Sequence, residues 1–300
     1  MRSRHQPSRR GGFTLIELLV VISILAILAG LTLAGISRVR SGQNRATTES
    51  TAKKLQVALN QQAATSYEEA TKEGNPYLAL VTAFCDGDKD RAKSLLSYAY
   101  MKRDFPQTFD EAKAPLTLPG VGAFPGHKAF TTLPSSAASG LSADQQSAVL
   151  LYIIVTEKGN KGTSSTGDAF ASATITIKGT SADFTVLKDG YGTHLAFVRW
   201  YGATPLNTEV QAAPYVNPKD ASFDRCDPLG KLRLNPWPVS GNTNRNKSLF
   251  ILNNPVGSPS VDFDGLNKVL TVISAGPDKI FGTGDDIYGY PLARLGAKGD

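Results

Sequence analysis

The stretch GGFTLIELLVVISILAILAGLTLAGI, residues 11–36, decides how this chain of 300 residues is organised. From residue 13 onward it is apolar except for Thr, Ser and one charged residue, Glu17. A run of this length exceeds the ~20 residues that a helix needs to cross the hydrocarbon core of a bilayer. A secretory signal peptide has a shorter apolar core followed by small residues, whereas here two glycines come before the run. The sequence therefore predicts a transmembrane helix at residues 13–36, preceded by a short leader.

The predicted leader, residues 1–12, carries four arginines and no acidic residue. Without it, the 32 basic and 26 acidic residues of the chain become 28 and 26, so the net charge falls from +6 to +2. The rest of the chain has no Lys/Arg stripe with interleaved aromatics of the kind that follows phosphates, so no nucleic-acid partner is expected. Basic residues ahead of an apolar segment also predict that the leader stays in the cytoplasm and that the chain after Arg38 lies outside.

Glu17 is the one charge in the apolar run. A carboxylate near the end of a spanning segment costs a few kcal/mol unless it finds a partner. Cleavage before Phe13 would create an α-amino cation four residues away, and in a helical bundle the amino terminus of a neighbouring copy could pair with this carboxylate. The alternative is a carboxylate that reaches up to the membrane interface.

Residues 11–17, GGFTLIE, resemble the prepilin cleavage and methylation motif of type IV pilins and type II secretion pseudopilins. The resemblance implies cleavage by prepilin peptidase between Gly12 and Phe13, N-methylation of Phe13, and pairing of Glu17 with a neighbouring amino terminus during assembly. One departure is Ala34, where many members of the family have a proline. The sequence therefore predicts no proline kink in the apolar helix.

The same resemblance implies a structural subunit and not an enzyme. The expected role is in a pseudopilus or pilus-like filament that serves type II secretion; the alternative is a type IV pilus or surface adhesin that binds a surface, a polymer or DNA. The expected partners are prepilin peptidase, other copies and other pilins, and an inner-membrane assembly platform. The expected location is the inner membrane, in a single pass with the head outside, and then a periplasmic or cell-surface filament.

Motifs for catalysis are missing from the sequence. It contains no GxSxG, P-loop or HExxH pattern, and its three histidines, His5, His127 and His194, form no metal-binding spacing. The two carboxylates of a glycosidase are recognised by their separation in space, so sequence alone does not address them. A membrane-anchored hydrolase is therefore the least favoured of the three functional classes.

Beyond the membrane, the pattern favours an α+β fold in which a long helical spine packs on a head with a small antiparallel β-sheet. Ala52, Leu55, Ala58, Leu59, Gln62 and Ala63 recur at helical spacing, and Glu73–Pro76 ends that helix. The expected organisation is a leader at 1–12, a transmembrane helix at 13–36, an amphipathic helix at 37–72, a variable helical and loop region at 73–170, and a β-rich head with an acidic loop at 171–300.

Within the variable region, helices are expected near 77–84 and 90–102, and residues 114–142 are expected to form a loop or extended connection. The apolar stretch at 143–156 is compatible with a short helix or a buried strand. In the β-rich head, short β-branched runs bounded by turn residues predict antiparallel strands. Their residues are 173–177, 183–187, 195–201, 248–252 and 269–274.

KDGYGTHLAFVRW, residues 188–200, reads as a tight turn leading into a strand. Gly190 and Gly192 are available for positive φ, and Asp189 is placed to cap backbone amides. The segment resembles the one that opens the sheet in major pseudopilins. His194 has no partner ligand in the sequence, so a structural role is expected for it.

ISAGPDKIFGTGDDIYGY, residues 273–290, places Asp278, Asp285 and Asp286 in a glycine-rich loop. Calcium takes six to eight oxygen ligands, which a loop with three carboxylates suits, although the spacing is not that of an EF-hand. The loop resembles the calcium loop of major pseudopilins. That resemblance implies carboxylate ligands at these three residues and backbone oxygens around Ser274 and Ile280. The alternative is an Asp/Gly surface turn without metal.

CDGDKDR, residues 85–91, spaces three aspartates as an EF-hand does, but Arg91 stands where that loop needs glycine. A loop leading to a helix cap is therefore expected.

The two cysteines, Cys85 and Cys226, stand in no metal-binding or redox spacing. In an exported chain they could form a disulfide if their Cα atoms come within roughly 7 Å. The alternative is two buried thiols.

Overall fold

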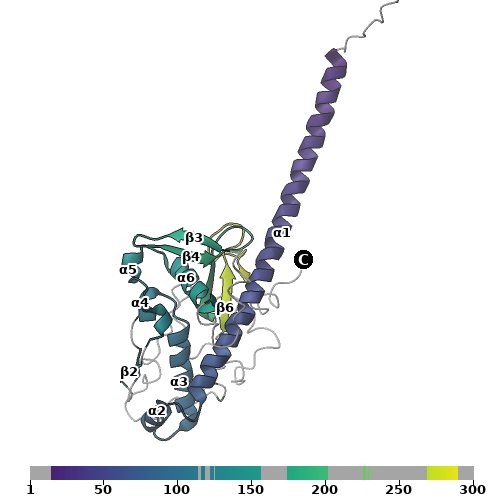
Figure 1. The fold of residues 1–300 in the computed structure, drawn as a ribbon. Helices are drawn as coiled ribbons and strands as arrows, with labels where there is room; N and C mark the ends of the chain where they lie inside the picture. Colours follow the sequence, from purple (N-terminus) through teal and green to yellow (C-terminus); the bar gives the residue numbers. More distant parts are fainter. Residues whose placement is uncertain are drawn as a thin grey trace, which may run out of the picture. The chain divides into compact units, whose positions relative to one another are not determined.

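The computed structural model describes residues 15–113, 116–118, 122–124, 126–156, 174–201, 226–227, 229, 231 and 269–289 (Figure 1). The chain divides into two compact units, Met1–Asn44 and Arg45–Asp300. Helix α1, Leu15–Thr71, contributes residues to both. It is continuous through Ala34, in agreement with the absence of a proline.

In the first unit, the described part of α1 exposes a succession of large apolar side chains between Leu15 and Leu28. Glu17 lies in the first turn. Among the residues that the structure describes, no helix combines the length and the apolar character needed to cross a membrane. The transmembrane assignment of residues 13–36 stays a prediction.

The second unit begins with the remainder of α1, which buries one face. Four residues of the predicted stripe are buried: Ala52, Leu55, Leu59 and Ala63. The same face also buries polar residues that the apolar pattern does not reveal: Thr48, Gln56 and Ser66. The helix ends where the Asn75 side-chain amide donates to the carbonyl oxygens of Glu69 and Ala70, at 2.9 and 3.2 Å, because these last carbonyls have no partner within the helix.

Two further helices follow, α2 at Leu78–Phe84 and α3 at Lys89–Asp104, and they pack on each other. Asp88 is the N-cap of α3 and accepts a hydrogen bond from the backbone amide of Arg91 at 3.1 Å. The helix cap predicted for the 85–91 segment is therefore confirmed. Asp86 and Gly87 both have positive φ in the turn between the helices.

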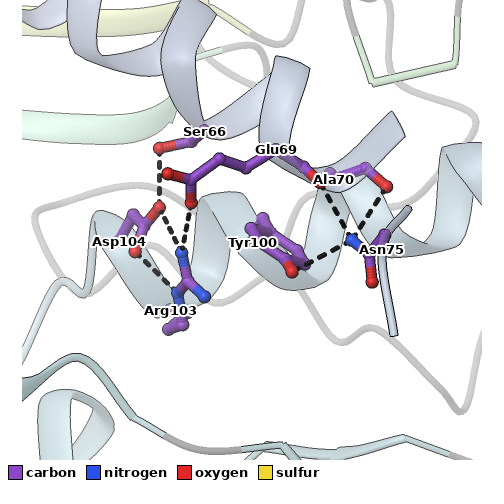
Figure 2. A network of polar contacts seen from close by, with 7 residues as sticks. All are labelled: Ser66, Glu69, Ala70, Asn75, Tyr100, Arg103 and Asp104. Atoms are coloured by element: carbon purple, nitrogen blue, oxygen red, sulfur yellow. Dashed lines mark hydrogen bonds and ion pairs between the residues drawn. The ribbon is translucent and has the colours of Figure 1, made fainter. Parts of the chain in front are cut away.

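Helices α1 and α3 are joined by a polar network (Figure 2). The Ser66 hydroxyl donates to the buried Asp104 carboxylate at 2.6 Å, and the Arg103 guanidinium donates to both oxygens of Asp104 at 2.7 and 3.0 Å. The Arg103 guanidinium also lies 4.2 Å above the centre of the Tyr100 ring and 3.5 Å from the Glu69 carboxylate. Each charge in this contact thus has an opposite charge or an aromatic face beside it.

The region expected to be a loop, residues 114–142, contains short regular elements instead. After α4 at Phe109–Lys113 come a hairpin of β1, Leu116–Leu118, and β2, Gly122–Phe124. A 3₁₀ turn at Lys128–Phe130 and helix α5 at Ser136–Ser139 follow. The Pro- and Gly-rich composition hid them because such short elements are held by burial of single aromatics, Phe124 and Phe130, which are fully buried.

The ambiguous stretch at 143–156 is helix α6, Ala143–Thr156, which packs on strands β4 and β5. The described strands of the head form two antiparallel sheets. One pairs β3, Thr174–Lys178, with β4, Asp183–Leu187. The other has the order β5-β6-β7, with bounds Leu195–Tyr201, Val269–Ser274 and Ile287–Tyr288.

The small antiparallel sheets and the long amino-terminal helix confirm the α+β fold class, but the expectation of one shared sheet is wrong for the described strands. The predicted strand at 248–252 lies outside the described residues. One hydrophobic cluster joins the second-unit part of α1 with α3, α6 and the strands β4, β5 and β6. The β5-β6-β7 sheet therefore has a fixed position against the second-unit part of α1. This position also places the turn before β5 and the loop after β6.

Candidate functional site

The turn before β5 is organised around Asp189, which is buried. Its Oδ1 atom accepts hydrogen bonds from the backbone amides of Tyr191 and Thr193, at 2.9 and 2.8 Å. The predicted capping role of Asp189 is thus confirmed. Gly192 has φ +80 as expected, whereas Gly190 does not adopt a positive φ.

The Asp189 turn connects three elements that are far apart in the sequence. The other carboxylate oxygen of Asp189 accepts from the Ser274 hydroxyl at 2.6 Å, where β6 ends. The backbone amide of Gly190 donates to the Thr48 hydroxyl at 2.9 Å, on the buried face of α1. The turn therefore fixes the end of β6, and with it the start of the acidic loop, against α1.

The acidic loop, residues 275–286, turns back between β6 and β7 and is held by its own carboxylates. Asp278 accepts from the amide of Ile280 at 2.8 Å, and Asp285 accepts from the amide of Asp278 at 3.2 Å. Gly276 has φ +65, and a Cβ there would lie 2.3 Å from the carbonyl oxygen of Asp285, so only glycine fits. The loop is consequently closed on itself at its base.

Asp286 differs from the other two acids of the loop. Its Oδ2 atom accepts from the amide of Gly282 at 2.8 Å and from the Tyr288 hydroxyl at 3.3 Å, while its Oδ1 atom is buried with no hydrogen-bond partner among the described residues. Burial, with a smaller contribution from the charges of Asp285 and Asp278, raises the pKa of Asp286 to about 6. A buried carboxylate oxygen of this kind is unfavourable unless a proton or a cation compensates it.

These observations bear on the predicted calcium ligands. Asp278, Asp285 and Asp286 are in one loop, but among the residues that the structure describes no three His, Cys, Asp or Glu side chains gather into a group that could hold a metal ion. The Ile280 carbonyl accepts from the Thr283 hydroxyl at 3.2 Å. The orphaned oxygen of Asp286 is the feature that fits a cation, and the calcium assignment stays a prediction.

His194 has the structural role expected of it. Its Nε2 atom lies 2.8 Å from a carboxylate oxygen of Asp144, in the first turn of α6, and its ring lies 5.3 Å from that of Phe281 in the acidic loop. The hydrogen bond to His194 lowers the pKa of Asp144. His194 thus connects the amino-terminal end of α6 to the acidic loop.

One ion pair of the head, between Arg199 and Glu111, has no local signal in the sequence. Arg199, on β5, is fully buried; its guanidinium donates to the Glu111 carboxylate at 2.9 Å and to the Phe105 carbonyl at 3.0 Å. Its backbone amide donates to the side chain of Gln107 at 3.1 Å. A pairing between residues this far apart has no local pattern, so only the fold reveals it.

The residues of the predicted cleavage site, Gly12 and Phe13, lie outside the described residues. Glu17 is described, in the first turn of α1, where the partial positive charge of the helix amino terminus favours a carboxylate. Its neighbours Leu15, Ile16 and Leu18 are exposed in the single chain. This part of α1 thus offers one acidic and several apolar side chains to contacts outside the chain.

Comparison with known proteins places residues 7–33 in the family model described as "Prokaryotic N-terminal methylation motif". That motif is the signature of prepilin-type cleavage. The chain carries the type IV pilin and pseudopilin signature. No curated protein and no solved structure matches the chain.

The matched motif gives this pilin-like chain a general role. The motif supports a pilin-like precursor that prepilin peptidase processes and that assembles with other pilins into filaments. The motif indicates a structural subunit. The match covers the amino-terminal segment alone, so the function of the pilin-like head rests on its own geometry.

Proposed function

We propose that this pilin-like chain is a subunit of a type II secretion pseudopilus. The observation that carries the proposal is the Asp189 turn, which ties α1, through Thr48, to the end of β6 and the acidic loop. This arrangement fits a scaffold, since the part of α1 in the second unit and the acidic loop are held in one hydrogen-bonded unit. No nucleic-acid partner is part of the proposal.

Residues 13–36 would span the inner membrane, with the leader in the cytoplasm and the head outside. Cleavage after Gly12 would leave the amino group of Phe13 four residues from Glu17. In a bundle of such helices, the Glu17 carboxylate of one copy would pair with the amino terminus of the next, which compensates both charges in an apolar environment. The exposed apolar side chains between Leu15 and Leu28 would pack between copies.

Processing is tested by mass spectrometry of the full chain from its native host. The expected result is a membrane form that begins at a methylated Phe13. A membrane form that retains residues 1–12 would contradict the proposal. Glu17→Gln, which keeps the size and removes the charge, should abolish filament assembly but leave cleavage intact, since the charge acts after the cut.

The type of filament is tested in cells that lack this chain and in sheared wild-type cells. A pseudopilus subunit is expected to be needed for secretion of exported proteins into the medium, with no long surface fibres at native expression. Long extracellular fibres together with normal secretion would instead favour the alternative, a pilus or adhesin subunit that binds a surface, polymer or DNA.

The acidic loop is proposed to bind calcium through Asp278, Asp285 and Asp286. The support is the buried, orphaned Oδ1 atom of Asp286 and the loop's excess of carboxylates, which calcium prefers as ligands. A bound calcium ion would supply a positive charge to this loop and so keep Asp286 ionised.

Calcium binding is tested by thermal unfolding of the full chain in detergent, with calcium or with chelator. Calcium is expected to raise the melting temperature, and Asp286→Ala is expected to remove that response. Asp183→Asn, an exposed carboxylate on β4 outside the loop, is the matched control and should respond as the wild type does. Identical melting curves with calcium and chelator would refute the assignment.

A further inference from the structure

We propose that Cys85 and Cys226 form an intrachain disulfide once the head has left the cytoplasm. The structure records both as buried thiols. They are far apart in the sequence, yet both belong to the same hydrophobic cluster, with exposed fractions of 1% and 4%. The oxidising environment rests on the proposed placement of the head outside the membrane, where disulfides form and persist.

Cys85 is held at the junction of α2 and α3. Its backbone amide donates to the carbonyl oxygens of Val81 and Thr82, at 2.9 and 3.1 Å, as the C-cap of α2. Its carbonyl oxygen accepts from the amide of Asp88 at 3.0 Å, and Asp88 is the N-cap of α3. Cys85 therefore lies within one tight turn of the start of α3.

Cys226 is brought to the same helix by its neighbour in the chain. The Asp227 carboxylate accepts from the Ser94 hydroxyl, in the second turn of α3, at 3.1 Å. Both groups are buried, so this hydrogen bond is shielded from water. Asp227 also accepts from the backbone amide of Lys231 at 2.7 Å, so Lys231 lies beside Asp227.

A second contact places Lys231 beside the turn that contains Cys85. The Lys231 ammonium lies 3.3 Å from the carboxylate of Asp88, the same residue whose amide bonds to the Cys85 carbonyl. Asp227 is thus attached to α3 at Ser94, and Lys231 is attached to the N-cap of α3, Asp88. The Ser94–Asp227 and Asp88–Lys231 contacts join residues that are 133 and 143 positions apart in the sequence. Together they bring Cys226 to the neighbourhood of Cys85.

The bond would form by thiol–disulfide exchange with an oxidised protein dithiol of the exported compartment. The thiolate of one cysteine attacks that disulfide and gives a mixed disulfide, and the thiolate of the second cysteine then displaces the carrier. The chain loses two hydrogen atoms and gains one S–S bond, while the carrier leaves as a dithiol. Because both cysteines are buried in the folded head, the exchange would occur before folding is complete.

The experiment uses the full chain isolated from its host with free thiols blocked at lysis. Digestion without reductant, followed by mass spectrometry, is expected to yield one cross-linked peptide pair that contains Cys85 and Cys226. Reductant is expected to lower the melting temperature of the full chain by roughly 5–15 °C, since a bridge over a long loop restricts the unfolded state. The Cys85→Ser/Cys226→Ser variant should melt at the same temperature with and without reductant.

Two results would overturn the proposal. One is blocking reagent on both cysteines of the isolated chain, and the other is a bridge between two copies instead of within one. A parallel sample is made by cytoplasmic expression and then refolded in oxidised and reduced glutathione. It tests the proximity of the two cysteines separately from the exported location of the head. A bridge in the refolded sample alone would contradict the exported location and leave the proximity supported, whereas no bridge in either sample would contradict the proximity itself.

Discussion

Helix α1 is held to the head in two ways along its length. Near the β5-β6-β7 sheet, the side chain of Gln56 bonds to the backbone of β6, with 2.6 Å to the Leu270 carbonyl and 3.0 Å to the Val272 amide. Roughly three turns further along the helix, Ser66 and Glu69 instead meet charged side chains of α3, Asp104 and Arg103 (Figure 2).

The two contacts differ in the charge of their groups and in whether their partners belong to the main chain. The sheet contact uses neutral groups and partners that are part of the main chain, so it specifies the register of α1 against β6. The α3 contact pairs ionised side chains, and its net contribution is the balance of Coulomb attraction and lost hydration. We therefore expect the sheet contact to be the more costly to break and the α3 contact to be the more sensitive to salt.

The largest effect is expected for Gln56→Leu. The substitution leaves the Leu270 carbonyl and the Val272 amide buried without this partner, at about 3 kcal/mol of unfolding free energy. Chemical denaturation of the full chain measures it. Gln61→Leu, at an exposed position of the same helix, is the control and should change stability by less than about 0.5 kcal/mol. Equal losses of unfolding free energy in the two variants would mean that the hydrogen bonds of Gln56 to β6 do not stabilise the head.

Asp104→Asn is expected to cost about 2 kcal/mol, since it removes the buried charge that faces Arg103. The deficit relative to wild type should shrink as salt is raised, because salt screens the exposed part of the ion pair. Denaturation at low and high salt tests this. Asp90→Asn, exposed in the first turn of α3, should lose only the weak interaction with the helix dipole.

Thr48→Val is expected to cost about 1 kcal/mol, because the amide of Gly190 loses its hydroxyl acceptor while the shape of the side chain is kept. Thr47→Val, exposed one position earlier, should be near neutral. A Thr48→Val effect as large as that of Gln56→Leu would mean that the Asp189 turn, and not β6, dominates the contact with α1.

The smallest effect concerns a charged contact outside α1. Because the pKa of Asp144 is lowered in the folded state, its contribution to stability is complete above the unfolded pKa of about 3.9 and is lost as pH falls toward the folded pKa. Asp144→Asn should therefore reduce stability by less than about 1 kcal/mol at pH 7 and have less effect at pH 3. A penalty that grows in acid would contradict the pairing with His194. Thermal unfolding across that range measures it.

The sequence predicted the elements that have a strong local signal. The apolar period of α1, the Asp88 cap and the Asp189 turn depend on neighbours a few positions away, so they could be read directly. The polar contacts of Thr48, Gln56 and Arg199 could not, because their partners are fixed only by the tertiary fold. The hairpin of β1 and β2 was hidden for the same reason, since Phe124 is buried by distant side chains.

The contact between Gln56 and β6 also determines how late in synthesis the packing of α1 can be completed. Its two hydrogen bonds join residues 214 and 216 positions apart. At a ribosomal rate of roughly 5–20 residues per second, the partners of Gln56 appear roughly 10–45 s after Gln56 itself. During that interval the buried face of α1 has no sheet to pack on. The head therefore cannot complete its packing against α1 until translation has passed β6.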